Sequence, residues 1–270
     1  MTETRIGVVG CAGYMGRLLV KIAQETDGLT VTAGSERAGS DMVGRDAGEI
    51  AGIGPIGVAI TDDADALFAS CDLAIDFTHH TVTPGLIPLA RKHDTKLVVG
   101  TSGLTAETEA ELAELAKDVP VLYSTSMSPV VNILFGLTKQ VAGMLGEDYD
   151  IEIIDFHHRR KVDAPSGTTL SLGKLAAEGR GVSHDDAAIY AREGDTGARP
   201  AGGIGYAVLR GGDVVGEHKV MFIGEGERME IGTMTTDRSA YARGTIRAAG
   251  WLADKGPGLY HMRDVLGLPG

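Results

Sequence analysis

The chain has 270 residues, of which 43% are hydrophobic and 23% are charged, a composition typical of a globular protein with one large domain or two smaller ones. Its formal net charge of −12 disfavours general nucleic-acid binding, because phosphate contacts need a basic face. The longest apolar runs stop short of the roughly 20 residues that span a membrane, and no secretory signal is evident. Two cysteines, Cys11 and Cys71, suit a reducing compartment, so we expect a cytoplasmic protein.

The first 128 residues alternate between β-type runs and helical patterns. Runs such as "DLAIDFT" have almost no polar alternation, which suits strands that are buried on both faces of a parallel sheet. Repeated strands and helices imply right-handed crossovers, so this part predicts an α/β fold with a Rossmann-type, doubly wound sheet. The expected strands are residues 4–10, 29–35, 72–78, 95–103 and 119–126, and the expected helices are residues 14–26, 81–93 and 105–118.

After about residue 128, β-type runs follow one another with few helices between them, which favours an α+β domain with a mixed or antiparallel sheet. The last helical pattern is short and is expected to pack back onto the first domain. We therefore expect two domains, residues 1–128 with 239–270, and residues 129–238. The expected helices here are residues 129–145, 167–178 and 239–254, and the expected strands are residues 149–158, 202–212, 213–224 and 227–236.

A glycine-rich loop, "GCAGYMG", joins the first strand to the first helix and places glycines at positions 10, 13 and 16. A dinucleotide site needs a tight turn there, close approach of backbone to the pyrophosphate, and a helix N-terminus facing the phosphates. The spacing is G-x-x-G-x-x-G rather than the stricter G-x-G-x-x-G. A glycine-rich turn without a ligand therefore remains an alternative for this loop taken alone.

Glu36 and Arg37 follow the second expected strand, about 20 residues beyond the loop. A carboxylate at this place accepts the ribose 2′-hydroxyl of NAD, whereas an arginine pairs with the 2′-phosphate of NADP. Because the chain has both residues in succession, we expect it to use both NADH and NADPH. The alternative is a solvated pair of surface charges.

Two further turns, "GTSG" (residues 100–103) and "STSM" (residues 124–127), follow buried strands at their carboxyl ends, where open α/β sheets bind ligands. Their hydroxyl groups could hydrogen-bond the ribose or the nicotinamide amide. The alternative is ordinary turn chemistry and helix capping, for which Thr105 is well placed.

The segment "HHRRKVDAPSGTT" (residues 157–169) gathers positive charge in an acidic chain. His157 is a candidate acid/base, since the ordinary pKa of histidine lies near working pH, and Lys161 is a candidate proton donor or electrostatic clamp. Residues 166–169 open a helix whose free N–H groups form an anion site. Together they predict a small substrate that carries carboxylate groups.

This segment allows two other interpretations. A metal site would use His157, His158 and Asp163, but adjacent strand residues point to opposite faces, so we expect no metal. A solvated basic turn would explain "RRK" alone, but not its combination with "PSGTT".

The segment "HHRRKVDAPSGTT", together with "GCAGYMGR", "GTSG", "GDVVGEHKVMF" and "MRDVLGL", resembles the 4-hydroxy-tetrahydrodipicolinate (dihydrodipicolinate) reductases of bacterial lysine and diaminopimelate biosynthesis. The resemblance covers essentially the whole chain. It implies NAD(P)H-dependent reduction of a cyclic, imine-type dicarboxylate, with loss of its hydroxyl as water. It also implies a dinucleotide-binding first domain and a second domain that binds substrate, joins a homotetramer and takes part in domain closure.

The resemblance assigns site residues position by position. His157 becomes the acid/base, Lys161 the proton donor and His158 a substrate contact, while Gly167 and Thr168 hold a carboxylate. The implied cofactor residues are Gly10, Cys11, Ala12, Gly13, Tyr14 and Met15 in the loop, Glu36 and Arg37 at the ribose, and Gly100, Thr101, Ser102, Ser124, Thr125, Ser126 and Met127 on the nicotinamide side.

Four positions depart from the family pattern. Ser126 stands where an asparagine is common, and Pro129 and Val130 lie near the place of a usual glycine, so nicotinamide orientation or the hinge is expected to differ. Tyr14 replaces a residue that is often basic, which removes one phosphate contact. These departures leave room for a reductase of another cyclic imine or carbonyl acid. A catalytically silent cofactor-binding sensor is a further alternative, against which the intact His157 counts.

Overall fold

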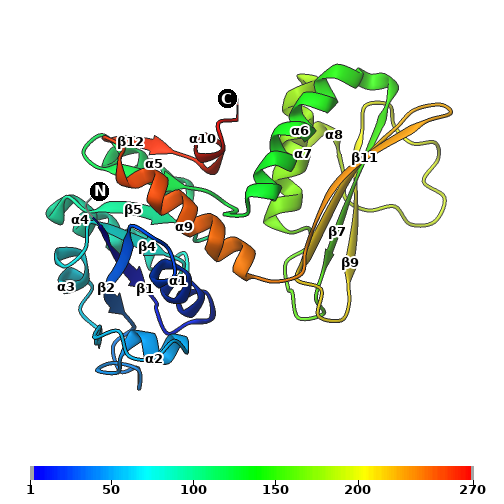
Figure 1. The fold of residues 1–270 in the computed structure, drawn as a ribbon. Coiled ribbons are helices and arrows are strands. Elements are labelled where there is room, and N and C mark those ends of the chain that lie inside the picture. Colours follow the sequence, from blue (N-terminus) through cyan, green and yellow to red (C-terminus); the bar gives the residue numbers. More distant parts are fainter. Residues whose placement is uncertain (1–2, 269–270) are drawn as a thin grey trace. The chain divides into compact units, whose positions relative to one another are not determined.

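The structure, a computed structural model, describes residues 3–268 of the chain. Within these residues the chain divides into two compact units, which are coloured by sequence in Figure 1. Unit 1 consists of residues up to 128 and from 239 to 268, and unit 2 of residues 129–238. Each unit has its own hydrophobic core.

Unit 1 contains a seven-stranded sheet in the order β12-β6-β5-β4-β1-β2-β3, with parallel pairing throughout. The predicted doubly wound α/β sheet is therefore confirmed. Its strands are β1 (Thr4–Val9), β2 (Leu29–Ser35), β3 (Ile60–Thr61), β4 (Leu73–Asp76), β5 (Lys96–Val99), β6 (Pro120–Tyr123) and β12 (Gly258–Tyr260).

Helices cover both faces of this sheet, which explains why its central strands lack polar alternation. One core cluster joins strand residues such as Val8 to Leu19 and Ile246 of the helices, and the other joins Leu97 to Leu86 and Leu112. The helices are α1 (Tyr14–Gln24), α2 (Ala47–Ala51), α3 (Ala64–Ala69), α4 (Thr83–His93), α5 (Ala106–Leu115), α9 (Ser239–Ala253) and α10 (Met262–Leu266).

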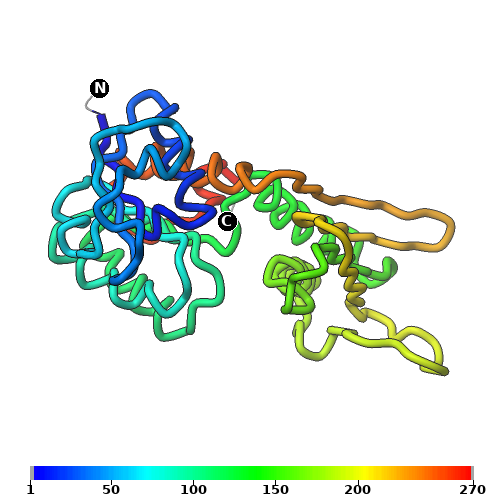
Figure 2. The backbone as a smooth tube through the Cα atoms, turned by 90° about the horizontal axis from the view of Figure 1, so that it is seen from below, coloured from blue at the N-terminus to red at the C-terminus, as the bar shows by residue number. Residues whose placement is uncertain are grey.

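Unit 2 contains a five-stranded sheet in the order β11-β10-β7-β9-β8. Strand β10 is antiparallel to β7 and β11, whereas β9 is parallel to β7 and β8, so the predicted mixed sheet is confirmed. Figure 2 shows β10 and β11 side by side as one long hairpin. The elements are α6 (Pro129–Leu145), a 3₁₀ turn (Gly146–Asp148), β7 (Asp150–His157), α7 (Gly167–Arg180), α8 (His184–Ala187), β8 (Ala188–Ile189), β9 (Ile204–Arg210), β10 (Gly216–Ile223) and β11 (Arg228–Thr235).

The strand β7 alternates strictly between buried and partly buried residues, as expected of a strand with one covered face. Its buried residues Ile151 and Ile153 belong to the core cluster that contains Leu134 of α6 and Leu172 of α7. Helices α6 and α7 therefore cover this face of the sheet (Figure 1).

Helix α7 is held close to α6 by glycines. A Cβ on Gly179 would lie 2.2 Å from the Lys139 carbonyl oxygen, so only glycine permits this approach. This close packing holds α7 rigidly against α6. The first turn of α7 contains the anion-site residues that were predicted from the sequence.

Candidate active site

The glycine loop has the geometry that a dinucleotide site requires. Gly10 has a φ of +68°, and the N–H groups of Gly10 and Cys11 both donate to the Ser35 carbonyl, at 2.8 and 3.1 Å. A Cβ on Gly16 would lie 2.1 Å from the Gly10 carbonyl oxygen, so α1 packs against the loop without room for a side chain. Gly13 is the N-cap of α1 and has no side chain to cap its first turn, which leaves that turn to an anion.

The other residues of the loop differ in exposure. Cys11 and Ala12 are buried, Met15 is partly buried, and Tyr14 is 63% exposed. Burial, together with the nearby Glu36 carboxylate, raises the pKa of the Cys11 thiol to about 12, so this cysteine is not a reactive thiolate.

Glu36 is positioned by the loop itself, because its Oε1 accepts a 2.9 Å hydrogen bond from the N–H of Ala12. This bond fixes the carboxylate beside the glycine loop, and its second oxygen can accept from a ribose. Arg37, the next residue, is exposed. The arrangement fits an adenosine ribose next to the loop.

The two hydroxyl-rich turns follow β5 and β6, which lie in the same parallel sheet as β1, so all three strand ends meet at one edge. The Thr101 hydroxyl accepts from the Thr78 N–H at 3.1 Å, and the Ser124 hydroxyl donates to the Ser126 carbonyl at 2.8 Å. These two side chains thus make hydrogen bonds that stabilise the turns, as the alternative interpretation expected. Thr105 caps α5 by accepting from the Thr108 N–H.

The remaining residues of these turns are placed as follows. Gly100 is partly buried, Ser102 and Thr125 are exposed, and Ser126 and Met127 are buried. A Cβ on Gly100 would lie 2.1 Å from the Phe77 ring, so glycine is required there.

In unit 2, His157 is the last residue of β7 and is only 8% exposed. Its Nδ1 lies 2.5 Å from Oδ1 of Asp155, two residues earlier on the same face of the strand. The other oxygen, Oδ2, accepts from the Ser166 N–H at 2.6 Å and from Nη2 of Arg210 at 3.2 Å. Burial alone would raise the pKa of Asp155, but these three hydrogen bonds outweigh it and lower the pKa below its ordinary value.

His158 and Lys161 lie beyond the end of β7. His158 Nε2 is 3.4 Å from Nη2 of Arg238, and desolvation together with this neighbouring cation lowers the pKa of His158. Lys161 is partly buried, and its Nζ lies 2.9 Å from Oδ1 of Asp163. Desolvation opposes ionisation of Asp163, but the lysine outweighs it and lowers the pKa of the carboxyl.

Helix α7 begins at Gly167, where the sequence predicted a helix to open. Ser166 is the N-cap, and its Oγ accepts from the Thr169 N–H at 3.3 Å. Gly167 is exposed and Thr168 is partly buried. Arg159 and Arg160, next to the catalytic candidates, are exposed.

Three members of this site, Asp155, Arg210 and His218, were not predicted from the sequence. His218 lies on β10 with its ring centroid 5.1 Å from that of His157, and its Nδ1 is 3.0 Å from the Thr169 hydroxyl. Burial, and then repulsion from His157, lower the pKa of His218 to about 4, so it is neutral at pH 7. The i, i+2 spacing of Asp155 and His157 is a signal in the sequence that could have indicated part of this network, and the segment "GDVVGEHKVMF", which contains His218, is another.

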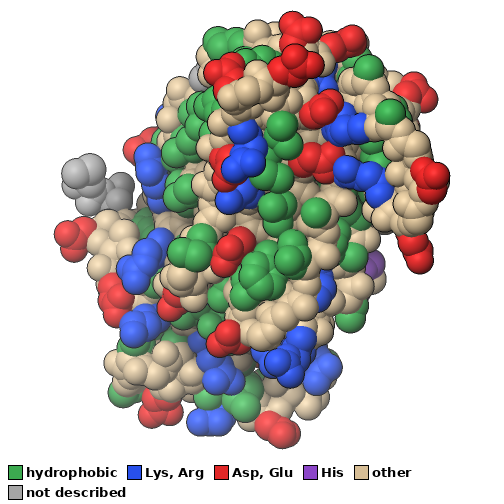
Figure 3. Space-filling model, turned by 90° about the vertical axis from the view of Figure 1, so that its right-hand side faces the viewer, with side chains coloured by type: hydrophobic (Ala, Val, Ile, Leu, Met, Phe, Trp, Pro, Cys, Tyr) green, Lys and Arg blue, Asp and Glu red, His purple; other side chains and the backbone are tan. Residues whose placement is uncertain are grey.

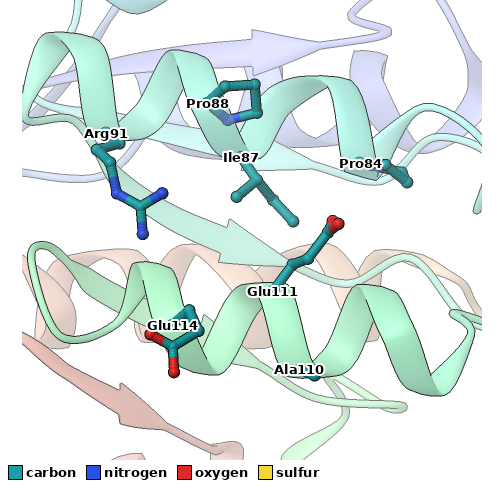
Figure 4. A pocket seen from close by; sticks show the side chains of 7 residues that line it. All are labelled: Pro84, Ile87, Pro88, Arg91, Ala110, Glu111 and Glu114. Carbon is teal, nitrogen blue, oxygen red and sulfur yellow. The ribbon is translucent and has the colours of Figure 1, made fainter.

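Within residues 3–268, no group of three or more His, Cys, Asp or Glu side chains could hold a metal ion. Among the same residues, no helix is long and apolar enough to cross a membrane. A surface groove between α4 and α5, lined by charged residues such as Arg91, Glu111 and Glu114, contains none of the candidate residues (Figure 4).

The chain matches two family models, those of the dihydrodipicolinate reductase N-terminus over residues 4–127 and of the C-terminus over residues 130–266. A "4-hydroxy-tetrahydrodipicolinate reductase" of Anaeromyxobacter dehalogenans (strain 2CP-1 / ATCC BAA-258) is 48% identical over 267 residues, or 99% of both chains. The protein of the same name from Alkalilimnicola ehrlichii (strain ATCC BAA-1101 / DSM 17681 / MLHE-1) is 46% identical over 98% of this chain and 99% of its own.

Solved structures show the same fold. The dipicolinate-bound dihydrodipicolinate reductase of Paenisporosarcina sp. TG-14 superposes with a TM-score of 0.73 at 21% identity, covering 96% of this chain and 98% of that one. An amine dehydrogenase of Mycobacterium smegmatis gives 0.63 at 14% identity, over 100% and 97% of the two chains. Family models across nearly all of the chain and close relatives along its full length confirm what the motifs predicted: the chain belongs to the dihydrodipicolinate reductase family.

Proposed function

We propose that this protein reduces 4-hydroxy-tetrahydrodipicolinate to tetrahydrodipicolinate with NAD(P)H and with loss of water, a step of lysine and diaminopimelate biosynthesis. Full-length relatives at 46 to 48% identity carry this activity in their names. The observation that carries the proposal is the intact segment 157–169. Two residues before it, the buried carboxylate of Asp155 contacts both the candidate acid/base His157 and Ser166, the N-cap of the anion-site helix.

Residues 1–128 with 239–270 form the dinucleotide-binding domain in this proposal. The bound nicotinamide supplies a hydride. The uncapped first turn of α1 holds the pyrophosphate, and Glu36, fixed by Ala12, accepts from the ribose. Arg37 beside it accommodates a 2′-phosphate, so both NADH and NADPH are used. The cofactor residues are Gly10 to Met15, Glu36, Arg37, Gly100 to Ser102 and Ser124 to Met127.

Residues 129–238 form the substrate-binding domain. The N–H groups of Gly167 and Thr168, with the Thr168 hydroxyl, hold one carboxylate of the substrate at the start of α7. His158 and Lys161 contact the rest of the dianion. The reduction adds a hydride and a proton, whereas loss of the hydroxyl as water takes up one proton and releases another from the adjacent carbon. One proton is therefore consumed overall, and the site needs groups that both donate and accept protons. His157 and Lys161 supply and return these protons.

We also propose that the protein is a cytoplasmic homotetramer joined through the sheet of unit 2. Side chains that alternate with the buried residues of β7 point to the face opposite α6 and α7. That face includes Phe156, its register partner Leu209, which is 44% exposed, and Met234, which is 68% exposed. Figure 3, which looks onto the molecule from the right-hand side of Figure 1, shows hydrophobic side chains among charged ones. Light scattering should give about four times the chain mass of 28.2 kDa.

A coupled assay tests the activity. The unstable substrate is generated in situ from pyruvate and aspartate semialdehyde with the preceding enzyme, and the absorbance of NADH or NADPH is followed. Oxidation that requires both the coupling enzyme and this protein is expected with both cofactors. No oxidation at any cofactor concentration would contradict the proposal and favour the cofactor-binding sensor. Activity on another cyclic imine alone would show a changed substrate. Discrimination above a thousandfold would disprove dual cofactor use.

A further inference from the structure

The polar network beneath His157 contains a carboxylate to which the proposed mechanism gives no role. Asp155 is fully buried, and its side chain projects from β7 on the same face as Ile151, Ile153 and His157. A buried carboxylate is costly unless several donors satisfy it. Asp155 has three side-chain or backbone donors, and each belongs to a different part of unit 2.

The first donor is the imidazole of His157. Nδ1 and Oδ1 lie 2.5 Å apart, within hydrogen-bond distance. An ionised carboxylate can only accept, so the proton of this bond must reside on Nδ1. The other ring nitrogen, Nε2, is then a proton acceptor in the neutral ring and a donor in the charged ring.

The second oxygen of Asp155 contacts the substrate side of the site. Oδ2 accepts from the N–H of Ser166, the N-cap of α7, at 2.6 Å. Arg210 completes the arrangement from β9, since its Nη2 lies 3.2 Å from Oδ2 and donates to the Asp163 carbonyl at 2.8 Å. One carboxylate therefore connects the acid/base, the carboxylate-binding turn and the loop that carries Lys161.

We propose that Asp155 is a positioning residue that holds His157 in the Nδ1–H tautomer, with Nε2 free for proton transfer, and aligns it with the first turn of α7. This inference rests on the proposed function, because the tautomer of His157 matters only if this residue transfers a proton in the proposed reaction. Asp155 does not contact the substrate itself. It acts through His157 in one direction and through Ser166 in the other.

Asp155→Asn separates positioning from a merely structural role. An asparagine has nearly the same shape, and its carbonyl oxygen can still accept from Ser166 and Arg210. Its amide would then face His157 and donate to Nδ1, which forces the ring proton onto Nε2. The variant is therefore expected to keep the turn and reverse the tautomer.

The first measurement is ¹⁵N NMR of the histidine rings in the protein without substrate, with the His157 signals assigned by their loss in His157→Gln. Wild type should show Nδ1–H, and Asp155→Asn should show Nε2–H. A wild-type ring with its proton on Nε2 would overturn the proposal even if no variant folds. This test needs no reductase activity, so it remains decisive if the proposed function fails.

The second measurement is kcat and the KM for substrate in the coupled assay. In Asp155→Asn, kcat should fall at least about a hundredfold while the KM for substrate stays within threefold, because the anion turn is retained. Asp150→Asn is the matched control: it lies on the same strand, pairs with Arg199 and should leave tautomer and kcat within twofold of wild type. Unchanged tautomer and kcat in Asp155→Asn would refute the proposal.

Discussion

His218 makes the stability of unit 2 sensitive to moderately acidic pH. The side chain is 4% exposed and lies on β10, facing His157 and Asp155 of β7, Arg210 of β9 and Lys161 of the following loop. Burial is the largest cause of its lowered pKa of about 4, and repulsion by the charged neighbours outweighs attraction by Asp155. The folded state therefore holds this histidine neutral.

The magnitude follows from linkage between protonation and folding. The unfolded chain has a histidine pKa of about 6.5, so its protonation stabilises the unfolded state as the pH falls below that value. The contribution of neutral His218 to the free energy of unfolding is fully present above about pH 7. It is lost progressively as the pH falls to the folded-state pKa of about 4. Between pH 7.5 and pH 5, protonation of this one group lowers the free energy of unfolding by about 2 kcal/mol.

The comparison variant is His218→Asn, which keeps an oxygen near the position of Nδ1 for the Thr169 hydroxyl but cannot titrate. Urea unfolding followed by far-ultraviolet circular dichroism should show that wild type loses about 2 kcal/mol more than the variant between pH 7.5 and pH 5. Trp251 lies in unit 1, so its fluorescence is the control for the other unit. Equal pH dependence in both proteins, or an NMR titration giving His218 a pKa above 6, would refute the reasoning.

Three further substitutions have clear expected outcomes. Lys161→Ala should lower turnover at least about a hundredfold in the coupled assay, and a variant within twofold of wild type would remove this lysine from the mechanism. Gly16→Ala places a Cβ 2.1 Å from a loop carbonyl and should weaken cofactor binding at least about tenfold by calorimetry, a loss of about 1.4 kcal/mol, whereas Gly250→Ala, in open space on α9, should leave it unchanged. Gly173→Ala places a Cβ 1.6 Å from the Tyr206 hydroxyl and should cost about 1–3 kcal/mol in urea unfolding. Adding Tyr206→Phe should restore part of that loss, and no restoration would mean that the clash lies elsewhere.

The large elements of the fold could be predicted because local pattern determines them. Continuous apolar runs indicate strands buried on both faces, and β4 and β5 show this burial. The strand β12 was missed because it has only three residues, and its pairing with Pro120 to Leu122 links segments more than a hundred residues apart. Such pairing is decided by tertiary contacts that a local window does not contain.

The site was predictable only where a contiguous motif marks it. The segment 157–169 contains the candidate acid/base, the candidate lysine and the proposed anion-binding turn. Their residue types and spacing could therefore be recognised in one contiguous stretch of sequence. Arg210 and His218 stand on strands that meet β7 only after folding. His218 lies within the segment "GDVVGEHKVMF", but no local pattern connects either residue with His157. Asp155 could have been inferred, since period-2 alternation puts it on the face of His157.

The acid sensitivity and the positioning of His157 have one physical cause. The covered face of β7 begins with Ile151 and Ile153 and continues with Asp155 and His157. The two ionisable side chains are therefore buried directly beside an apolar core. In that environment each polar atom must find a fixed partner, because water is excluded. The resulting hydrogen bonds restrict the ring of His157 to one orientation, and the same desolvation prevents His218 from accepting a proton. A variant that admitted water beneath β7 should therefore lose less unfolding free energy between pH 7.5 and pH 5 than wild type, and it should also have a lower kcat.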